Sequence, residues 1–460
     1  MADSIVQLDR YDRQLRIWGS MGQELLDKAH ICLIGPHNSL LRESLRNLVL
    51  LGVSKFSWVA QDDVSDDYSS IGAYSTSIED DIASIRPGEV EFNIINSSNE
   101  PVDYCNFDLV IKLNAEKEIS LKTSTRCNLP PTITVKSAGF YGFVKLALSE
   151  PHLVLDPHNE HPKVDLRLDQ PWSNLKKYLD TFKMAGVDLN GLIEYPYPII
   201  LNNVIQKLMS AETDLSTNAI KKTLKEIYGN KCLAKGFDRL NYLEAQRYAS
   251  RACGKAEHDR FIVRLNSDIE PYILEQYQKN ANKWSDTMNE QLCELIIKLT
   301  KFVNEQSLGL PLQGKFPDME SDHNEYQKLK DIYDRHKTDY MTSFLQKSYQ
   351  KESTINGDIL DLFCSSFMDL TILKPLTSEG TPRQSELYNI LSKVEFSDSN
   401  TRKHDEFSSI SKPSLFPVDT FLAGLASQEA IKLITHQFIP IDNTFVYDGL
   451  KGEHTETLRT

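Results

Sequence analysis

The first third of the chain alternates short apolar runs with turns and amphipathic stretches. Residues 30–34 indicate a buried strand that ends at Gly35, and residues 39–51 place leucines at helical spacing before Gly52. A second strand is expected over 53–60. This order of strand, helix and strand predicts a βαβ unit, the building block of dinucleotide-type α/β domains.

The alternation continues beyond this unit. Further strands are expected at 88–95, 107–112, 131–136, 139–148, 152–156 and 443–447. Between about 170 and 350 the pattern is mostly helical, with amphipathic stretches such as 269–282 and 284–303. A polar stretch at 396–413 is typical of a linker, and a helix rich in small residues is expected over 420–435.

The simplest organisation is one α/β domain that a helical insertion interrupts. Residues 1–168 would form the first part of this domain, 169–410 the insertion, and 411–460 the part that completes the sheet. The expected fold class is therefore α/β, with a Rossmann-like domain and a mostly helical insertion.

The turn after the first strand lacks the residues that hold a nucleotide. A phosphate-binding turn needs G-x-G-x-x-G, because β-carbons would block the close approach of the phosphates. Here the turn begins at Gly35 and continues Pro-His-Asn-Ser-Leu, so only the first glycine is present. The second strand ends at Ala60, where an acidic residue for a ribose is expected. The scaffold is retained and the nucleotide site is degenerate.

Composition narrows the classes of function. The 460 residues carry a formal net charge of −14, which argues against a general nucleic-acid binder. No run of 18 apolar residues occurs, so no membrane-spanning helix is expected, and the first ten residues lack the apolar core of a signal peptide. Seven cysteines, without a C-x-x-C pair, fit a reduced cytoplasmic or nuclear setting.

Several segments resemble one family. The segment Tyr-Asp-Arg-Gln-Leu-Arg-Ile-Trp-Gly at 11–19 resembles the N-terminal signature of ubiquitin-like-modifier activating enzymes. Segments 165–172 (Asp-Leu-Arg-Leu-Asp-Gln-Pro-Trp), 310–319 and 421–435 are similar to the non-catalytic subunits of the heterodimeric enzymes that activate Rub/Nedd-type modifiers. The resemblance is scattered over residues 10–450 and is weakest between 200 and 300.

The resemblance implies a reaction that two related halves share. One half, a homologous catalytic subunit, binds ATP and Mg, adenylates the C-terminal glycine of a Rub/Nedd-type ubiquitin-like protein and takes the modifier on its own cysteine. A conjugating enzyme would then meet the assembled complex. This chain resembles the other half, a regulatory pseudo-enzyme that binds no cofactor of its own.

The same resemblance assigns positions to the degenerate pocket. Gly35 and Ala60 mark it, and the family's phosphate-binding arginine and helix-opening lysine fall on Ile71 and Tyr74. Arg13 is the expected catalytic contribution, because the family's arginine at this place reaches into the partner's site and contacts the ATP phosphates. The alternative is an ion pair with Asp12 or another nearby acid that only pins the N-terminal segment.

The cysteines and histidines are two other groups of candidate site residues. Four cysteines fall in the insertion, but none has the surroundings of the family's reactive cysteine, so no catalytic cysteine is expected: Cys232, Cys253, Cys293 and Cys364. His152, His158 and His161 are interpreted as part of a solvated loop rather than a metal site.

The alternative functions are the small subunit of a SUMO-type activating enzyme and a self-sufficient homodimeric adenylating enzyme.

Overall fold

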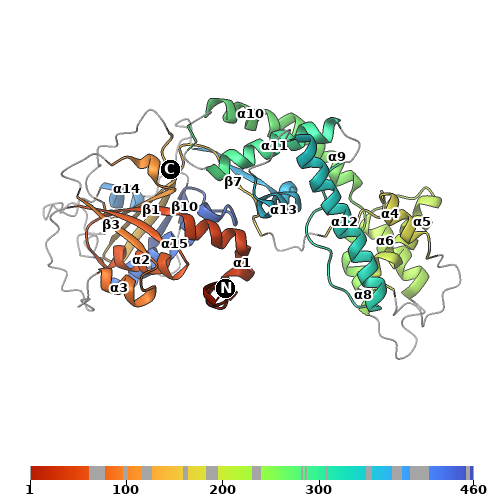
Figure 1. Cartoon of the computed structure of the whole chain (residues 1–460), viewed down its shortest axis with the longest axis horizontal. Coiled ribbons are helices and arrows are strands. Elements are labelled where there is room, and N and C mark those ends of the chain that lie inside the picture. Colours follow the sequence, from red (N-terminus) through yellow and green to blue (C-terminus); the bar gives the residue numbers. More distant parts are fainter. Residues whose placement is uncertain are drawn as a thin grey trace. The chain divides into compact units, whose positions relative to one another are not determined.

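The structure is a computed structural model of the chain (Figure 1). It describes residues 2–61, 78–96, 102–115, 127–158, 164–182, 195–229, 240–280, 283–284, 287–305, 309–348, 355–375, 386–393, 414–451 and 456–458. The chain divides into two compact units. Unit 1 comprises residues 1–158, 276–292 and 370–460, and unit 2 comprises residues 159–275 and 293–369.

An eight-stranded sheet forms the centre of unit 1. Its strands are β1 (His30–Gly35), β2 (Lys55–Ala60), β3 (Glu91–Asn96), β4 (Leu109–Leu113), β5 (Thr132–Ala138), β6 (Tyr141–Ala147), β9 (Thr444–Asp448) and β10 (Glu456–Leu458). Their order is β10-β9-β6-β5-β4-β1-β2-β3. The five strands from β3 to β5 are parallel, and β6, β9 and β10 extend the sheet in antiparallel fashion. The expected Rossmann-like α/β fold is confirmed.

Both faces of the sheet are covered by apolar cores. Successive side chains of one strand point to opposite faces, so each strand contributes to both cores. Ile31 and Leu33 of β1 lie in the larger core, while Cys32 and Ile34 lie in a smaller core on the other face. Figure 1 shows three helices beside the larger core: α2 (Ser39–Leu50), α3 (Ile78–Ile85) and α15 (Phe416–Thr435). The helix α1 (Ala2–Lys28) packs on α15, and α14 (Glu386–Lys393) covers β5 and β6 on the opposite face.

The strands expected from the apolar pattern are confirmed, with bounds that shift by a few residues. Two short strands were not expected from the sequence, β8 (Thr371–Leu373) and β10. A second, two-stranded sheet pairs β7 (His152–Val154) with β8. Three-residue strands carry too little alternation to be recognised in a sequence. The expected linker at 396–413 lies outside the described residues.

Unit 2 is built from helices, as the pattern of the middle region predicts. They are α4 (Ser173–Leu179), α5 (Tyr197–Ser210), α6 (Thr217–Leu224), α8 (Leu240–Tyr248), α9 (Lys255–Arg264), α12 (His323–Ser348) and α13 (Gly357–Ser366). Two further helices, α10 (Glu270–Lys279) and α11 (Thr287–Glu305), contain two of the four positions at which the chain passes between the units. The domain boundaries at 168 and 410 stay a prediction.

Candidate functional site

The parallel strands end at the edge of the sheet where a nucleotide binds in dinucleotide-type folds. The strand order changes direction between β1 and β4, and ligands bind at such a switch point beyond the carboxyl ends of the strands. Gly35 ends β1 and is paired with Ala60, which ends β2. Ile71 and Tyr74, expected to mark the same pocket, lie outside the described residues.

Gly35 has a structural reason to be glycine. It has φ of 153°, and a β-carbon at this position would lie 2.1 Å from the carbonyl oxygen of Leu113, at the end of β4. A side chain would therefore push β1 and β4 apart. The one glycine that remains of the phosphate-binding turn is required for strand packing, and its presence is not evidence of nucleotide binding.

The N-terminus of α2 is satisfied by the chain itself. In nucleotide-binding domains the free N–H groups at this helix end hold phosphate. Here the side chain of Asn38 caps the helix, because its Oδ1 accepts a hydrogen bond from the N–H of Leu41 at 2.9 Å. Asn38 is itself buried. A donor that a phosphate would use already has an internal acceptor.

A buried carboxylate lies next to the same helix end. Asp419, in the first turn of α15, is fully buried and accepts hydrogen bonds from three serine hydroxyls. Oδ2 of Asp419 accepts from Ser39, the first residue of α2, and from Ser414 at 2.9 Å. Oδ1 accepts from Ser137, near the end of β5, at 2.6 Å. The carboxylate thus links α2, α15 and the sheet at the edge where phosphates would be bound.

The environment of Asp419 sets its charge. Burial raises the pKa of this carboxyl, and the three serine hydroxyls oppose the effect only in part. Asn114, which follows β4, extends the network, since its side chain donates to the hydroxyl of Ser137 at 3.2 Å and accepts from the N–H of Ser137 at 2.8 Å. The polar groups at this edge therefore bond to one another.

The signature segment at 11–19 lies on α1, and one side of it faces the protein. Tyr11 is buried, with the guanidinium of Arg86 6.0 Å from the centre of its ring. Trp18 is buried as well, and its Nε1 donates to Gln23 at 3.1 Å. The side chain of Gln437, just beyond α15, donates to the carbonyl oxygen of Trp18 at 2.9 Å. These contacts fix α1 on unit 1.

The other side of the segment faces solvent, and it carries Arg13. Asp12 pairs with Arg16 at 2.9 Å, so the acid next to Arg13 is already bonded to another cation. Within the described parts of the chain, Arg13 makes neither an ion pair nor a hydrogen bond. An ion pair of Arg13 with Asp12, the alternative considered for this arginine, is therefore not formed.

Arg13 lies at the opposite end of α2 from the degenerate pocket. Its neighbour Gln14 donates to the carbonyl oxygen of Leu50, the last residue of α2, at 3.4 Å. The pocket lies at Ser39, the first residue of this 12-residue helix. With a rise of about 1.5 Å per residue, the two ends are about 18 Å apart. Arg13 is too far away to serve the pocket of its own chain.

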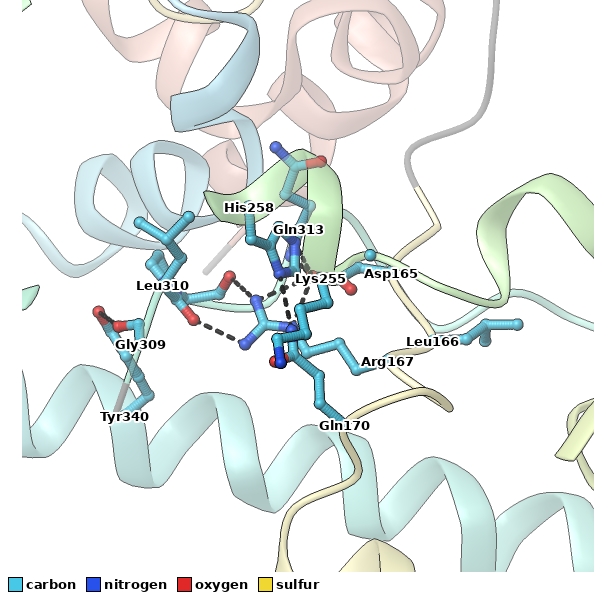
Figure 2. A network of polar contacts seen from close by, with 12 residues as sticks. Asp165, Leu166, Arg167, Gln170, Lys255, His258, Gly309, Leu310, Gln313 and Tyr340 are labelled. Atoms are coloured by element: carbon cyan, nitrogen blue, oxygen red, sulfur yellow. Dashed lines mark hydrogen bonds and ion pairs between the residues drawn. The ribbon is translucent and has the colours of Figure 1, made fainter. Parts of the chain in front are cut away.

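Two other segments of the resemblance meet in unit 2 (Figure 2). Arg167 is buried and pairs with Asp165 through Nε at 3.0 Å and Nη2 at 2.9 Å. It also donates to the carbonyl oxygens of Leu310, at 2.8 Å, and of Pro311. His258 lies 3.6 Å from the Asp165 carboxylate, and burial lowers its pKa. Because every nitrogen of the guanidinium is bonded internally, this network holds the two segments together.

The remaining candidate residues are cysteines and histidines. Among the described side chains, no group of three or more His, Cys, Asp or Glu residues is placed to hold a metal ion. Burial raises the pKa of Cys253 and of Cys364 to about 12, and Cys293 is fully buried. Cys232 and His161 lie outside the described residues. The solvated loop expected for the histidines is wrong for His152, which is buried at the start of β7. None of the helices in the described ranges is both long enough and apolar enough to span a membrane.

Comparison with known proteins gives a consistent result over almost the whole chain. The sequence is 31% identical to the NEDD8-activating enzyme E1 regulatory subunit of Saccharomyces cerevisiae, over 97% of this chain and 98% of the relative. It is 25% identical to the subunit of the same name from Danio rerio and 26% identical to the regulatory subunit AXR1 of Arabidopsis thaliana. These matches cover 96% of this chain in both cases and 96% and 94% of the relatives.

Other comparisons add little. No protein-family model matches the sequence. The Escherichia coli tRNA N6-threonylcarbamoyladenosine dehydratase aligns with a TM-score of 0.23 and 16% identity, over 40% of this chain and 77% of that one. This TM-score is too low to inform function. The full-length match to the yeast protein is decisive, and this chain belongs to the family of NEDD8-activating enzyme E1 regulatory subunits.

Proposed function

We propose that this chain is the non-catalytic subunit of a heterodimeric enzyme that activates a NEDD8-type ubiquitin-like protein. A homologous catalytic subunit would bind Mg-ATP, adenylate the C-terminal glycine of the modifier and take the modifier on its own cysteine. The complex would then pass the modifier to a conjugating enzyme in the cytoplasm or nucleus. The family to which the chain belongs supports this division of labour.

Arg13 carries the proposal. It is an exposed arginine on a helix that buried Tyr11 and Trp18 hold in place, and its neighbour Gln14 contacts the end of α2 that is about 18 Å from the pocket. A fixed guanidinium stabilises the charge that develops on phosphate oxygens, since it is planar, always charged and able to form two parallel hydrogen bonds. We infer that Arg13 supplies this cation to the nucleotide site of the partner.

The degenerate pocket supports the same division of roles, in which the partner subunit binds the nucleotide and this chain does not. Asn38 already accepts from the N-terminus of α2, and the Asp419 carboxylate lies beside that helix end. A triphosphate in this pocket would have to displace internal hydrogen bonds and approach a carboxylate. Family membership also favours this function over a SUMO-type small subunit or a self-sufficient homodimer.

The test is ATP–pyrophosphate exchange by the assembled heterodimer with its modifier present. Arg13→Ala should lower the exchange rate by a factor of about 10²–10³, the usual loss when one preorganised donor is removed, with no loss of the complex on gel filtration. Arg13→Lys should recover only part of the rate, because an ammonium does not reproduce the planar fork of donors.

Arg16→Ala is the matched control. Arg16 lies on the same exposed side of α1 and has the same charge, but it is paired with Asp12. Its replacement should leave exchange within about twofold of the wild type, the range expected for a surface ion pair. Equal losses for both variants would mean that general surface charge matters, and wild-type exchange by Arg13→Ala would refute the role given to Arg13.

A further inference from the structure

One pair of cysteines in unit 1 is joined. The Sγ atoms of Cys105 and Cys127 are bonded, and their Cα atoms are 5.9 Å apart, within the range of protein disulfides. Cys105 lies in the helical turn Tyr104–Asn106, just before β4, and Cys127 lies ahead of β5. Both residues are only half-buried. The pair therefore joins the segments that lead into two neighbouring parallel strands, β4 and β5.

The backbone on each side of the pair is held by contacts that do not involve sulfur. The N–H of Cys105 donates to the Asp103 carboxylate at 3.1 Å. Next to Cys127, the N–H of Asn128 donates to the carbonyl oxygen of Lys283 at 2.7 Å. The side chain of Asn128 donates to the carboxylate of Glu150 at 2.9 Å. The two sides are joined by the pairing of β4 with β5 and by the hydrogen bond from the N–H of Val110 to the carbonyl oxygen of Pro131 at 3.0 Å, neither of which depends on the sulfur atoms.

The other cysteines that the structure describes do not share these properties. Cys32, Cys293 and Cys364 are almost completely buried. Burial raises the pKa of Cys32 and of Cys253 to about 12, which leaves a negligible fraction of reactive thiolate at neutral pH. Among the cysteines in the described ranges, oxidation by a dissolved reagent should therefore be selective for the pair at 105 and 127.

We propose that Cys105 and Cys127 form a reversible redox site that a low-molecular-weight disulfide such as oxidised glutathione oxidises. The thiolate of one cysteine attacks a sulfur of oxidised glutathione, so that a mixed disulfide forms and one glutathione thiolate leaves. The second cysteine then attacks the protein sulfur and releases the second glutathione. The protein loses two electrons, and the two thiol protons end on the two glutathione molecules.

Reversibility follows from the setting, which rests on the proposed function. A modifier-activating enzyme works in a reducing compartment, where disulfides are mostly transient or sensory. The crosslink closes the segment 105–127, with a sequence separation of 22, and so restricts the unfolded chain. Oxidised protein should therefore melt roughly 5 °C above reduced protein.

The experiment is a thiol titration of the full chain in glutathione buffers from fully reduced to fully oxidised. Free thiols are alkylated, the protein is digested, and peptides are identified by mass spectrometry. Cys105 and Cys127 should change together from two alkylated thiols to one crosslinked peptide pair, in a single two-electron transition. The melting temperature should rise over the same range of buffers.

Two variants and one control variant make the titration decisive. Cys105→Ser should abolish the crosslink and the rise in melting temperature, and Cys127→Ser should do the same. Cys253→Ser, the control, should preserve both. A pair that stays reduced in excess oxidised glutathione, or stays crosslinked in excess reduced glutathione, would overturn the proposal. The readout needs no activity, so its failure is distinguishable from failure of the proposed function.

Discussion

The two ends of α2 differ in how the polar groups beside them are bonded. At the N-terminal end, the side chains of Asn38 and Asp419 bond to the groups that a nucleotide would use. At the C-terminal end, α1 is fixed by buried aromatic side chains, and Arg13 points to solvent with no partner in the described part of the chain. At the first end the polar groups are hydrogen-bonded within the chain, and at the second end the guanidinium of Arg13 is exposed to solvent.

This difference has a physical meaning. A buried polar group must be hydrogen-bonded, so a pocket that no longer binds a ligand is stable only if its own side chains satisfy it. An exposed arginine has no such requirement, because water satisfies it. The role proposed for Arg13 requires such a cation, exposed on a well-anchored helix and without a partner in the described part of the chain.

At the C-terminal end of α2, the packing of α1 depends on the buried side chain of Trp18. Its replacement by alanine removes a large buried side chain and leaves the Gln23 amide without its donor, so Trp18→Ala should lower the free energy of unfolding by about 3–5 kcal/mol. Chemical denaturation of the full chain measures this. Ile17→Ala, at the exposed neighbouring position, should change the free energy by no more than about 0.5 kcal/mol. Similar values for both variants would show that α1 is not anchored as described.

At the pocket end of α2, the hydrogen bonds converge on the Asp419 carboxyl. The dependence of protein stability on pH tests whether this carboxyl is buried. Because the folded state raises the pKa of this carboxyl above its ordinary value of 3.8, the folded protein holds the proton more tightly than the unfolded chain. The contribution of Asp419 to stability is therefore largest below about pH 4 and declines as pH rises through the folded pKa. It stays constant at higher pH.

Asp419→Asn removes the titrating group and keeps one acceptor oxygen for the serines. The wild type should lose stability relative to this variant as pH rises from about 4, when the two are compared by urea denaturation at several pH values. Asp419→Ala, which leaves three serine hydroxyls without their acceptor, should cost about 1–3 kcal/mol. Parallel pH profiles for wild type and Asp419→Asn would contradict the burial of a titrating carboxyl at this edge.

Much of the scaffold was predictable from the sequence, because it depends on local patterns. Continuous apolar runs marked the parallel strands, since both faces of these strands are buried. The helical spacing of the leucines of α2 and the lack of further glycines after Gly35 are also local features of the sequence. The outward position of Arg13 also follows from helical spacing once Tyr11 and Trp18 are placed inward.

Other features depend on contacts between distant parts of the chain. Ser39 and Asp419 are 380 residues apart, so no local pattern links them. The partners of Arg167, the carbonyl oxygens of Leu310 and Pro311, are backbone groups and carry no signal in the side-chain sequence. The pairing of Cys105 with Cys127 is of the same kind, because seven cysteines allow many pairings.

Nucleotide stoichiometry tests the contrast between the two ends of α2 most directly. Mg-ATP is titrated calorimetrically into the isolated chain and into the purified heterodimer. We expect no binding in the low micromolar range by the isolated chain, because its pocket is internally satisfied, and one nucleotide bound per heterodimer. Two nucleotides per heterodimer, or micromolar binding by the isolated chain, would contradict the account.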